Sequence, residues 1–164
     1  MCMQPPLILQ TLVLLTLANG TPVIINDILG DRLAIPIDGG ARFVDRRPLF
    51  SPSKTFRGIF FSILVTSACA PLVGVGWRIA TRVASVAMAG DLFSSFLKRR
   101  INLPTGARAT GLDQVPESLF PLLACRSVLP LTALDIVAAL VIFFFGQLLL
   151  SLLLYHFHLR DHPY

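Results

Sequence analysis

The stretch AGDLFSSFLKRR, residues 89–100, places one carboxylate inside an apolar segment and ends that segment with three consecutive cations. Ionisable side chains within membrane helices are unfavourable in lipid, and they usually face the bundle interior or a water-filled cavity. A cluster of cations is typical of a helix end on the cytoplasmic side. The stretch therefore predicts a membrane helix whose acidic residue, Asp91, lies about 10 Å from a cytoplasmic end.

The whole chain of 164 residues has the composition of an integral membrane protein. Hydrophobic residues make up 54% of it and charged residues only 14%, and its mean hydropathy is +0.73. A soluble domain of this size has too little interior to bury so much apolar surface. The formal net charge of +5 is modest. In a membrane protein it indicates loop orientation and contact with anionic lipid rather than nucleic-acid binding. The sequence sets no oligomeric state.

Apolar segments predict a bundle of helices, since about 20 apolar residues cross a hydrocarbon core about 30 Å thick. Pro116 stands where proline favours a helix start, and Pro130 stands where a helix must stop. The last apolar region is therefore expected to form two helices joined by a tight turn. The predicted fold is one all-α domain, residues 1–164, with about five transmembrane helices. The helices are expected at residues 6–29, 58–76, 78–97, 117–129 and 132–157.

Two polar loops, residues 30–57 and 98–115, carry most of the cations. The positive-inside rule places both loops and the C-terminal tail in the cytoplasm, which with five spans puts the N-terminus outside. The chain is thus predicted to be an integral protein of the cell (inner) membrane. The tail histidines, His156, His158 and His162, are expected to be solvated or to touch lipid headgroups rather than to bind a metal.

The end of the first loop reads SPSKTFRG, residues 51–58, and gathers hydroxyl and cationic side chains just before a helix. A helix N-terminus presents free N–H groups and the positive end of the helix dipole, so this segment is a candidate phosphate cradle. Its spacing is not that of a P-loop, which requires G-x-x-x-x-G-K-[ST]. A solvated basic loop that touches anionic lipid is the alternative interpretation.

The carboxylates near the second loop also have two interpretations each. Helical spacing puts Asp91, Ser95 and Lys98 on one helix face, where Asp91 either serves a functional site or pairs with a cation from a neighbouring helix. Asp113 and Glu117 stand four residues apart across a helix start. They either cap that helix or hold a hard cation such as Mg²⁺, which prefers oxygen ligands and shares its shell with phosphates.

Five motifs follow one another along the chain: NGTPV (19–23), PIDGG (36–40), PSKTFRG (52–58), GDLFSSFLKRR (90–100) and LDQ (112–114). Taken in order, these motifs resemble the CDP-archaeol synthase family, a small group of five-helix membrane enzymes related to the CTP:phosphatidate cytidylyltransferases. The resemblance covers most of the chain from about residue 19 to residue 117. One position departs from the family pattern, because a second aspartate commonly follows L-D-Q by two residues and this chain has Pro116 there, with Glu117 one place later.

The resemblance implies an Mg²⁺-dependent enzyme that transfers CMP from CTP to a lipid phosphate. The products would be pyrophosphate and a CDP-activated lipid of the CDP-archaeol or CDP-diacylglycerol type. It further implies a metal site of Asp91, Asp113 and Glu117, and a catalytic set of Asp91, Asp113 and Lys98. The substrate-binding residues that it implies are Asp38, Lys54, Thr55, Arg57, Lys98 and Arg99.

Two other functions are compatible with the residues. A non-catalytic membrane protein could bind anionic lipid or a partner through its basic loops, with Asp91 in an interhelical ion pair. A small transporter could use Asp91 as a proton or ion site, but such sites lie near mid-bilayer at broken helices, whereas Asp91 is about 10 Å from Lys98. The enzyme interpretation is favoured. Its expected partners are CTP, a lipid phosphate and membrane lipids, with no nucleic acid.

Overall fold

The computed structural model describes residues 4–104, 109 and 111–156, the last four without their side chains. Over these residues the fold is all-helical, with two isolated β-bridges in the first loop, which confirms the predicted fold class. The tail histidines lie outside the described side chains. The helices are α1 (Pro5–Leu29), α2 (Phe56–Cys69), the 3₁₀ helix η1 (Ala70–Val73), α3 (Trp77–Arg100), α4 (Gln114–Ala124) and α5 (Ala133–His156).

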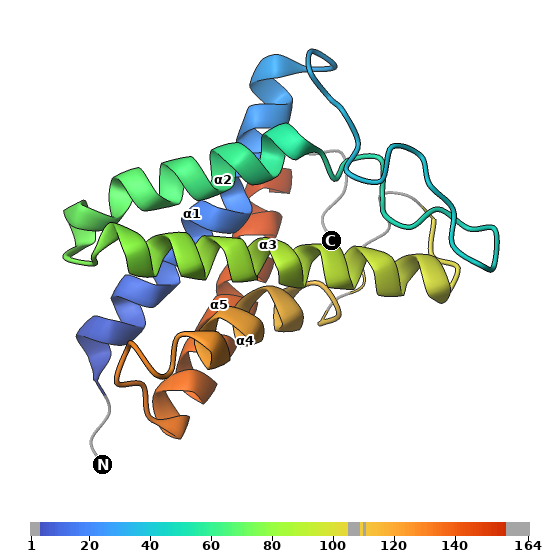
Figure 1. Ribbon diagram of the computed structural model, residues 1–164. Helices are drawn as coiled ribbons and strands as arrows, with labels where there is room; N and C mark the ends of the chain where they lie inside the picture. Colours follow the sequence, from blue (N-terminus) through green and yellow to red (C-terminus); the bar gives the residue numbers. More distant parts are fainter. Residues whose placement is uncertain (1–3, 105–108, 110, 157–164) are drawn as a thin grey trace.

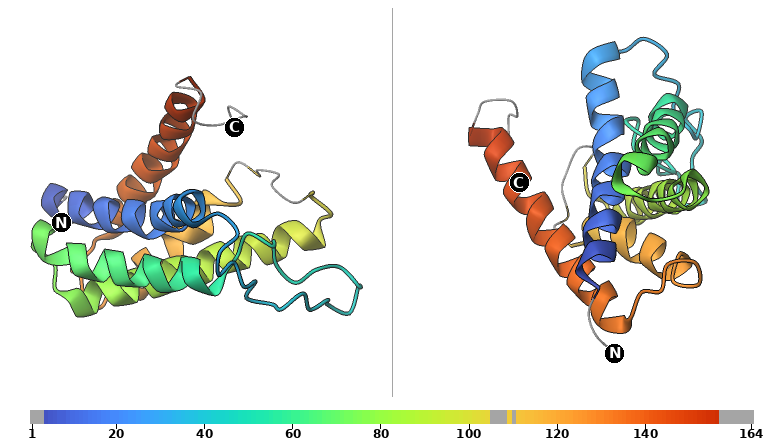
Figure 2. Two further views of the ribbon diagram at one scale, coloured as in Figure 1. Left: turned by 90° about the horizontal axis from the view of Figure 1, so that it is seen from above. Right: turned by 90° about the vertical axis from the view of Figure 1, so that its left-hand side faces the viewer.

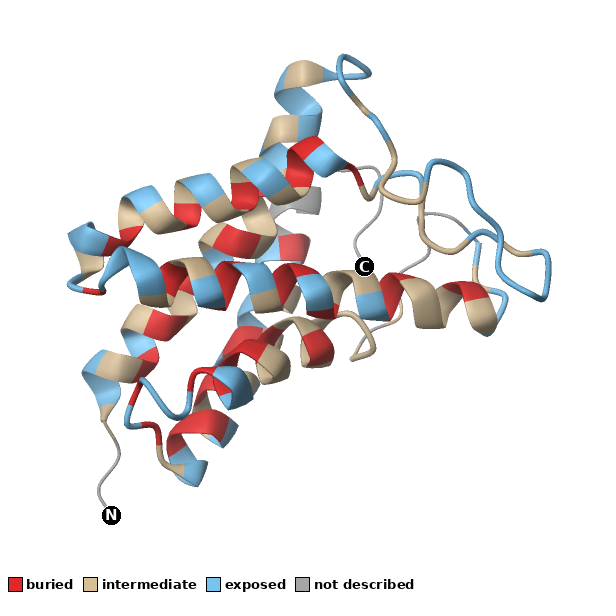
Figure 3. Cartoon of the chain, in the orientation of Figure 1, coloured by how far each residue is buried: buried red, intermediate tan, exposed pale blue. Residues whose placement is uncertain are grey.

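The helices pack as a bundle with its polar loops at one end. Helices α2 and α3 run side by side in opposite directions, α1 packs against both, and α4 lies along α3 (Figure 1). Helix α5 begins beside the start of α1 and diverges from it toward its own C-terminal end (Figure 2). Buried residues form stripes on the facing sides of the helices, whereas the first loop is mostly exposed (Figure 3). This loop and the end of α3 lie together (Figure 1).

Three of the described helical segments are long and apolar enough to cross a membrane: Pro5–Leu29, Phe56–Val73 and Ala133–Leu152. Large apolar side chains such as Phe60 and Phe145 are exposed on their outer faces, as expected where lipid rather than water surrounds a protein. Helix α3 is as long but carries charged residues at both ends. Helix α4 has 11 residues and therefore rises only about 16 Å.

Local chemistry explains where α2 begins and α3 ends. Helix α2 starts at Phe56, two residues before the expected start, because the Thr55 hydroxyl caps it by accepting a hydrogen bond from the Gly58 N–H at 3.3 Å. Helix α3 continues past Leu97 to Arg100. Cations in the last turn of a helix interact favourably with the negative end of its dipole, so the basic cluster extends the helix rather than ending it.

Helix α4 is shifted and shortened relative to the predicted span of 117–129. It begins at Gln114, so Pro116 is its third residue, where a missing N–H is tolerated because first-turn N–H groups have no intrahelical partner. It ends at Ala124, and hydrogen-bonded turns then carry the chain to Leu129. The two expected helices are present, but residues 125–132 connect them instead of a tight turn.

A side chain of α2 supplies the hydrogen bond that a proline inside α1 removes. Pro22 has no N–H, so the carbonyl of Ala18 lacks its intrahelical donor. Ser62 of α2 donates its hydroxyl hydrogen bond to this carbonyl, with an O–O distance of 2.6 Å. An unsatisfied carbonyl is costly in lipid, and a hydroxyl from a neighbouring helix is a usual remedy. The bond therefore fixes α1 against α2 one turn from Pro22.

One arginine attaches the first loop to the end of α3. The Arg100 guanidinium donates to the Asp45 carboxylate and to the Pro48 carbonyl, each at 2.6 Å. It also lies 4.9 Å from the ring centroids of both Phe43 and Phe96. Cation–π contacts of this kind add to the ion pair. The loop is therefore held against α3 by contacts that leave Arg100 little freedom to bind a substrate.

A buried acid joins the two terminal helices at the opposite end of the bundle. Asp135 of α5 is fully buried and accepts a hydrogen bond from the backbone N–H of Gln4 at 2.9 Å. It also accepts hydrogen bonds from the backbone N–H and the hydroxyl of Thr132, at 2.9 and 2.8 Å. Buried charge is tolerated when hydrogen bonds satisfy it. Asp135 thus connects the beginnings of α1 and α5.

Candidate active site

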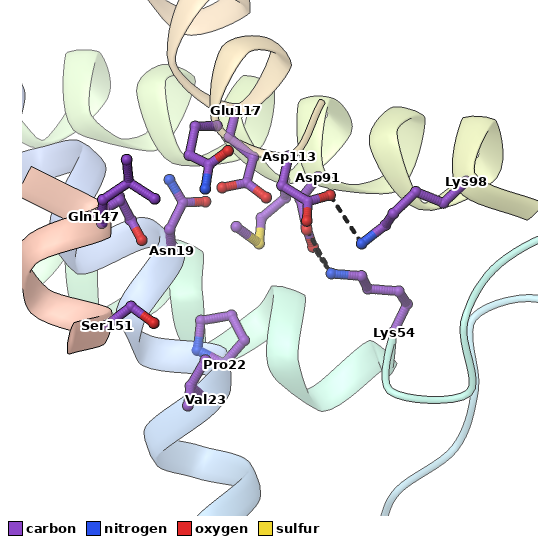
Figure 4. A pocket seen from close by; sticks show the side chains of 13 residues that line it. Asn19, Pro22, Val23, Lys54, Asp91, Lys98, Asp113, Glu117, Gln147 and Ser151 are labelled. Carbon is purple, nitrogen blue, oxygen red and sulfur yellow. Dashed lines mark hydrogen bonds and ion pairs between the residues drawn. The ribbon is translucent and has the colours of Figure 1, made fainter. Parts of the chain in front are cut away.

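A cavity of about 220 Å³ lies between the helices near the end that carries the first loop. Polar side chains from α1, α3, α4, α5 and the first loop converge on it (Figure 4). Apolar lining comes from Pro22, Val23, Met88 and Leu148. The polar lining comes from Asn19, Lys54, Asp91, Lys98, Asp113, Gln114, Glu117, Gln147 and Ser151.

Two ion pairs cross this cavity. The Lys54 ammonium lies 2.5 and 2.6 Å from the two carboxylate oxygens of Asp91. The Lys98 ammonium lies 2.8 Å from an Asp113 carboxylate oxygen. Only 15% to 24% of these four side chains is exposed. Asp91 therefore does pair with a cation, but the cation comes from the first loop rather than from a neighbouring helix, and the pair lies in a cavity rather than in a packed interface.

A close approach of α3 and α4 brings two carboxyl groups together. The Glu117 side chain lies close to that of Asp91. A Cβ atom on Gly90 would lie 2.4 Å from the Pro116 carbonyl oxygen, so only glycine permits this approach. Two carboxylates this close repel each other. The two carboxyl groups can therefore share a proton or take up a cation between them.

Asp113 occupies the N-cap position of α4 without capping it. Its backbone is in the αR region, with φ −80° and ψ −54°, and its side chain makes no capping hydrogen bond. A capping residue normally has extended dihedral angles and bonds an N–H of the first turn. The capping interpretation therefore lacks its defining bond, and the carboxylate of Asp113 faces Lys98 in the cavity instead.

A second cavity, of about 180 Å³, adjoins the first and shares Lys54 and Asp91 with it. Its own lining includes Ser53 and Thr55, two of the hydroxyl residues in the predicted phosphate cradle. Thr55 is buried and caps α2. The structure thus brings Lys54 and Thr55 to the same cavity wall.

Three of the predicted substrate-binding residues lie outside the linings of both cavities. The first is Asp38, whose carboxylate accepts hydrogen bonds from the backbone N–H groups of Gly40 and Phe50, each at 3.0 Å. It thereby organises the first loop. The second is Arg99, which is buried at the end of α3 and donates to the Pro104 carbonyl at 2.9 Å.

The third is Arg57, whose guanidinium closes the C-terminal end of α1. It is buried and donates to the Asn26 side-chain oxygen at 3.0 Å and to the Gly30 carbonyl at 2.5 Å, and it also donates to the Arg32 carbonyl. The last carbonyls of a helix have no intrahelical partner, and a cation satisfies them well. Arg57 therefore fixes α1 to the start of α2, next to Lys54.

Four polar residues that line the cavity were not among the predicted site residues: Asn19, Gln114, Gln147 and Ser151. Asn19 of α1 points toward Glu117 (Figure 4), and neither atom of its buried amide group has a hydrogen-bond partner among the described residues. Gln147 and Ser151 line the cavity from α5. The available signal was a polar residue inside an apolar span, but that pattern alone does not separate a site residue from one that bonds a neighbouring helix.

The donor set fits a hard divalent cation. Asp91, Asp113 and Glu117 supply carboxylate oxygens to one cavity, and the unpartnered amide of Asn19 supplies another oxygen. Among the described residues no three acidic, histidine or cysteine side chains form a ready-made metal cluster. Mg²⁺ does not require one, because it is commonly bound by one or two carboxylates together with substrate phosphates and water.

Over much of its length, the chain is similar to CDP-archaeol synthases of archaea. A model of the CarS-like CDP-archaeol synthase family matches residues 76–164. The CDP-archaeol synthase of Sulfurisphaera tokodaii is 34% identical over 79% of this chain and 81% of its own length. That of Hyperthermus butylicus is 40% identical over 60% of this chain. The chain spans 59% of the Hyperthermus protein in that match.

A solved structure has the same arrangement of helices. It is described as an intramembrane enzyme for archaeal membrane lipid biosynthesis, and it superposes with a TM-score of 0.72. The match covers 85% of this chain and 91% of the other, at 25% sequence identity. The likeness therefore extends over the whole bundle rather than over a single motif.

The fold and the charged cavity define an integral membrane enzyme whose site pairs lysines with carboxylates at its polar end. Enzymes that handle phosphates rely on such groups for positioning and charge neutralisation. The chain belongs to the CDP-archaeol synthase family.

Proposed function

We propose that this chain transfers CMP from CTP to the phosphate of a membrane lipid. An oxygen of the lipid phosphate attacks the α-phosphorus of CTP, and a new P–O bond forms. The bond between the α-phosphorus and the bridging oxygen breaks, and pyrophosphate leaves with the electron pair. The observation that supports this reaction most directly is the cavity that gathers three carboxyl groups and two lysines at the end of the bundle carrying the first loop.

Asp91, Asp113 and Glu117 would hold Mg²⁺ in this proposal. When bound, Mg²⁺ neutralises charge on the triphosphate and favours departure of pyrophosphate. The closeness of Glu117 to Asp91 supports a cation position at these two carboxyl groups. Glu117 would supply the carboxylate that the family pattern places one residue earlier, because the close approach of α3 and α4 at Gly90 brings it near Asp91.

Lys54 and Lys98 are the proposed phosphate ligands. Each ammonium group is held by a carboxylate, which neutralises both charges while no phosphate is bound. A polyanionic substrate offers each lysine an alternative partner of greater charge. Thr55 and Arg99 remain predicted phosphate ligands, while Arg57 is proposed to act by holding Lys54 in place.

The position of the cationic loops at one end of the bundle also supports a proposed orientation in the membrane. We place the end that carries the first loop, together with the second loop and the C-terminal tail, in the cytoplasm of a cell membrane, with the N-terminus outside. The cations of the first loop and the last turn of α3 support this orientation. CTP is a soluble cytoplasmic nucleotide, so it would reach the cavity from this side.

The proposed acceptor is a glycerol phosphate with ether-linked isoprenoid chains. Support comes from the relatives, which are named for CDP-archaeol. The test is to incubate purified protein with CTP labelled at the α-phosphorus, Mg²⁺ and either this ether lipid or its diacyl counterpart. We expect labelled CDP-lipid together with an equal amount of unlabelled pyrophosphate. A chelator should abolish both products, and added Mg²⁺ should restore them. Absence of product with every lipid phosphate would overturn the proposal.

A further inference from the structure

We propose that the end of the bundle opposite the first loop binds the phosphate of an anionic membrane lipid through Arg78, Arg82 and Arg126. In the proposed orientation this lipid belongs to the outer leaflet. The lipid site is separate from the candidate active site, because none of the three arginines lines either cavity. The proposal therefore does not depend on the reaction.

Nearby acidic side chains do not balance the positive charge at this end. Residues 66–86 and 118–134 contain the three arginines and no acidic residue. The acid that follows, Asp135, is fully buried and already hydrogen-bonded at the start of α5. Within the part of the chain that the structure describes, none of the three arginines forms an ion pair. Their charges can therefore attract an anion from outside the protein.

The packing of α3 and α4 brings the arginines to one surface. Arg78 and Arg82 are exposed and stand four residues apart, which places them on one face of α3. Arg126 is also exposed and follows Cys125, the residue that ends α4. The Arg82 guanidinium is close enough to the Cys125 thiol to act on it electrostatically. The start of α3 and the end of α4 both lie on the side away from the first loop (Figure 1).

The depth of Arg82 gives a physical reason for an anionic partner. Tryptophan favours the boundary between membrane and water, and Trp77 stands largely exposed at the start of α3. Arg82 lies five residues further along the helix, which is about 8 Å deeper. An unpaired cation below the boundary is unfavourable, but a long arginine side chain can extend back to the headgroup level. A lipid phosphate at that level would supply the missing negative charge.

The choice of cation also favours a phosphate. A planar guanidinium can donate two parallel hydrogen bonds to phosphate oxygens and is more weakly hydrated than an ammonium group. Arg78 lies 5.4 Å from the Trp77 ring centroid, and such a contact holds a guanidinium at the ring. Cations are scarce on the outer side of membrane proteins. Three arginines at this end, with no lysine in residues 66–86 or 118–134, therefore indicate recognition of a ligand.

The apolar surroundings favour a lipid over a free phosphate ion. Leu123 and Val128 stand on either side of Arg126 in the sequence, and both are exposed. Leu72 in η1, shortly before α3, is exposed as well. Binding to an anionic membrane grows with both apolar contact and electrostatic attraction. A lipid can cover these apolar side chains while its phosphate meets the arginines, whereas a free phosphate leaves them uncovered.

The test uses Trp77, the only tryptophan of the chain, as a reporter beside the site. The full-length protein is reconstituted in phosphatidylcholine vesicles that contain increasing fractions of brominated phosphatidylglycerol, whose bromine atoms quench tryptophan fluorescence at short range. We expect this anionic lipid to bind beside Trp77 about tenfold more tightly than brominated phosphatidylcholine does. Equal quenching by the two lipids at every fraction would overturn the proposal.

Two double variants separate this surface from the basic loops. Arg82→Gln combined with Arg126→Gln should reduce the preference for the anionic lipid to about twofold or less. Arg42→Gln combined with Arg46→Gln is the matched control, because it removes two exposed arginines from the first loop at the other end. The control should keep the full preference. An unchanged preference in the first variant, or an equal loss in the control, would contradict the assignment.

An excess of inorganic phosphate distinguishes a lipid site from a phosphate site. Compared with sodium chloride at equal ionic strength, which screens charges to the same extent, inorganic phosphate should not relieve the quenching. If it displaces the anionic lipid, the arginines bind free phosphate and the lipid assignment fails. Should the double variant not fold, each single substitution should lower the preference by about threefold.

Product formation provides an independent check. Arg82 and Arg126 line neither cavity, so product formation from CTP should be unchanged in their double variant. A loss of product there would place these arginines in the reaction and overturn a separate lipid site. Fluorescence quenching does not require turnover, so a failure of the proposed function would leave the lipid test intact.

Discussion

At the scale of single residues, Asp91 lies beside a lysine and another carboxyl group, and it lines both cavities. Its carboxylate pairs with Lys54 and lies close to Glu117. Its position, seven residues before the basic end of α3, would let it reach both a soluble nucleotide and a lipid phosphate in the proposed reaction.

We expect Asp91→Asn to reduce turnover by about 100-fold or more, because the amide keeps the shape of the side chain but loses the charge that binds a cation. Pyrophosphate release with saturating CTP and lipid phosphate measures the effect. Asp31→Asn removes an exposed acid just beyond α1 and should leave turnover intact. Undiminished turnover in Asp91→Asn would remove this residue from the site.

At the scale of helices, contacts between backbones position the site residues. Gly90 lets α4 approach α3 until Glu117 reaches Asp91. The hydrogen bond from Ser62 to Ala18 holds α1 and α2 together beside both cavities. Neither contact involves a residue that touches substrate in the proposed mechanism, yet both determine where the reacting groups lie.

Gly90→Ala should separate α3 and α4, since its Cβ would lie 2.4 Å from the Pro116 carbonyl oxygen. We expect a loss of about 1–3 kcal/mol in the free energy of unfolding, together with reduced turnover as Glu117 is displaced from Asp91. Gly146→Ala is the matched control: it also precedes a cavity residue within a helix, but its Cβ would meet nothing within 4 Å. That control should gain up to about 1 kcal/mol. Equal effects of the two substitutions would contradict the close-approach argument.

Ser62→Ala should lower the free energy of unfolding by about 1 kcal/mol, because it leaves the Ala18 carbonyl unsatisfied in a low-dielectric setting. Pro22→Ala restores the N–H that α1 lacks, so the penalty of Ser62→Ala should largely vanish in that background. A double-mutant cycle of unfolding in detergent measures the coupling. Additive effects of the two substitutions would refute the compensation.

At the scale of the whole molecule, the first loop and the basic end of α3 lie at one end, and the 3₁₀ helix η1 lies at the other (Figure 1). Arg100 and its contacts hold the first loop against α3. The bundle therefore presents a polar, cation-rich end and an opposite end with few charges. This asymmetry is the physical basis for the proposed orientation in the membrane.

Single-cysteine labelling tests that orientation. Val44 in the first loop is 91% exposed and Leu72 in η1 is 85% exposed. In a background of Cys2→Ser and Cys69→Ser, we expect Val44→Cys to react with a membrane-impermeant maleimide only in inside-out vesicles. Leu72→Cys should react only in intact cells. The buried Cys125 provides the unlabelled baseline, and the reverse pattern would invert the proposed topology.

The sequence by itself determined that the chain forms a set of helices, and it nominated most of the charged residues that line the candidate site. Helix formation depends on hydrogen bonds between residues four apart and on hydropathy over one span, so both can be predicted locally. The motif order nominated Asp91, Asp113, Glu117, Lys54 and Lys98, and all five line one cavity. Helix ends were less predictable, since a cap at Thr55 and the dipole at the end of α3 shifted them by a few residues.

Only the tertiary structure decided which of these residues meet. Lys54 and Asp91 are 37 positions apart, and their pairing depends on how α1, α2 and α3 pack, which no local pattern encodes. The same packing places Arg57, Arg99 and Asp38 outside the cavities and brings Asn19 in. The periodicity of a sequence predicts on which face of a helix a residue lies. Contacts such as the one at Gly90 decide which other helix packs against that face.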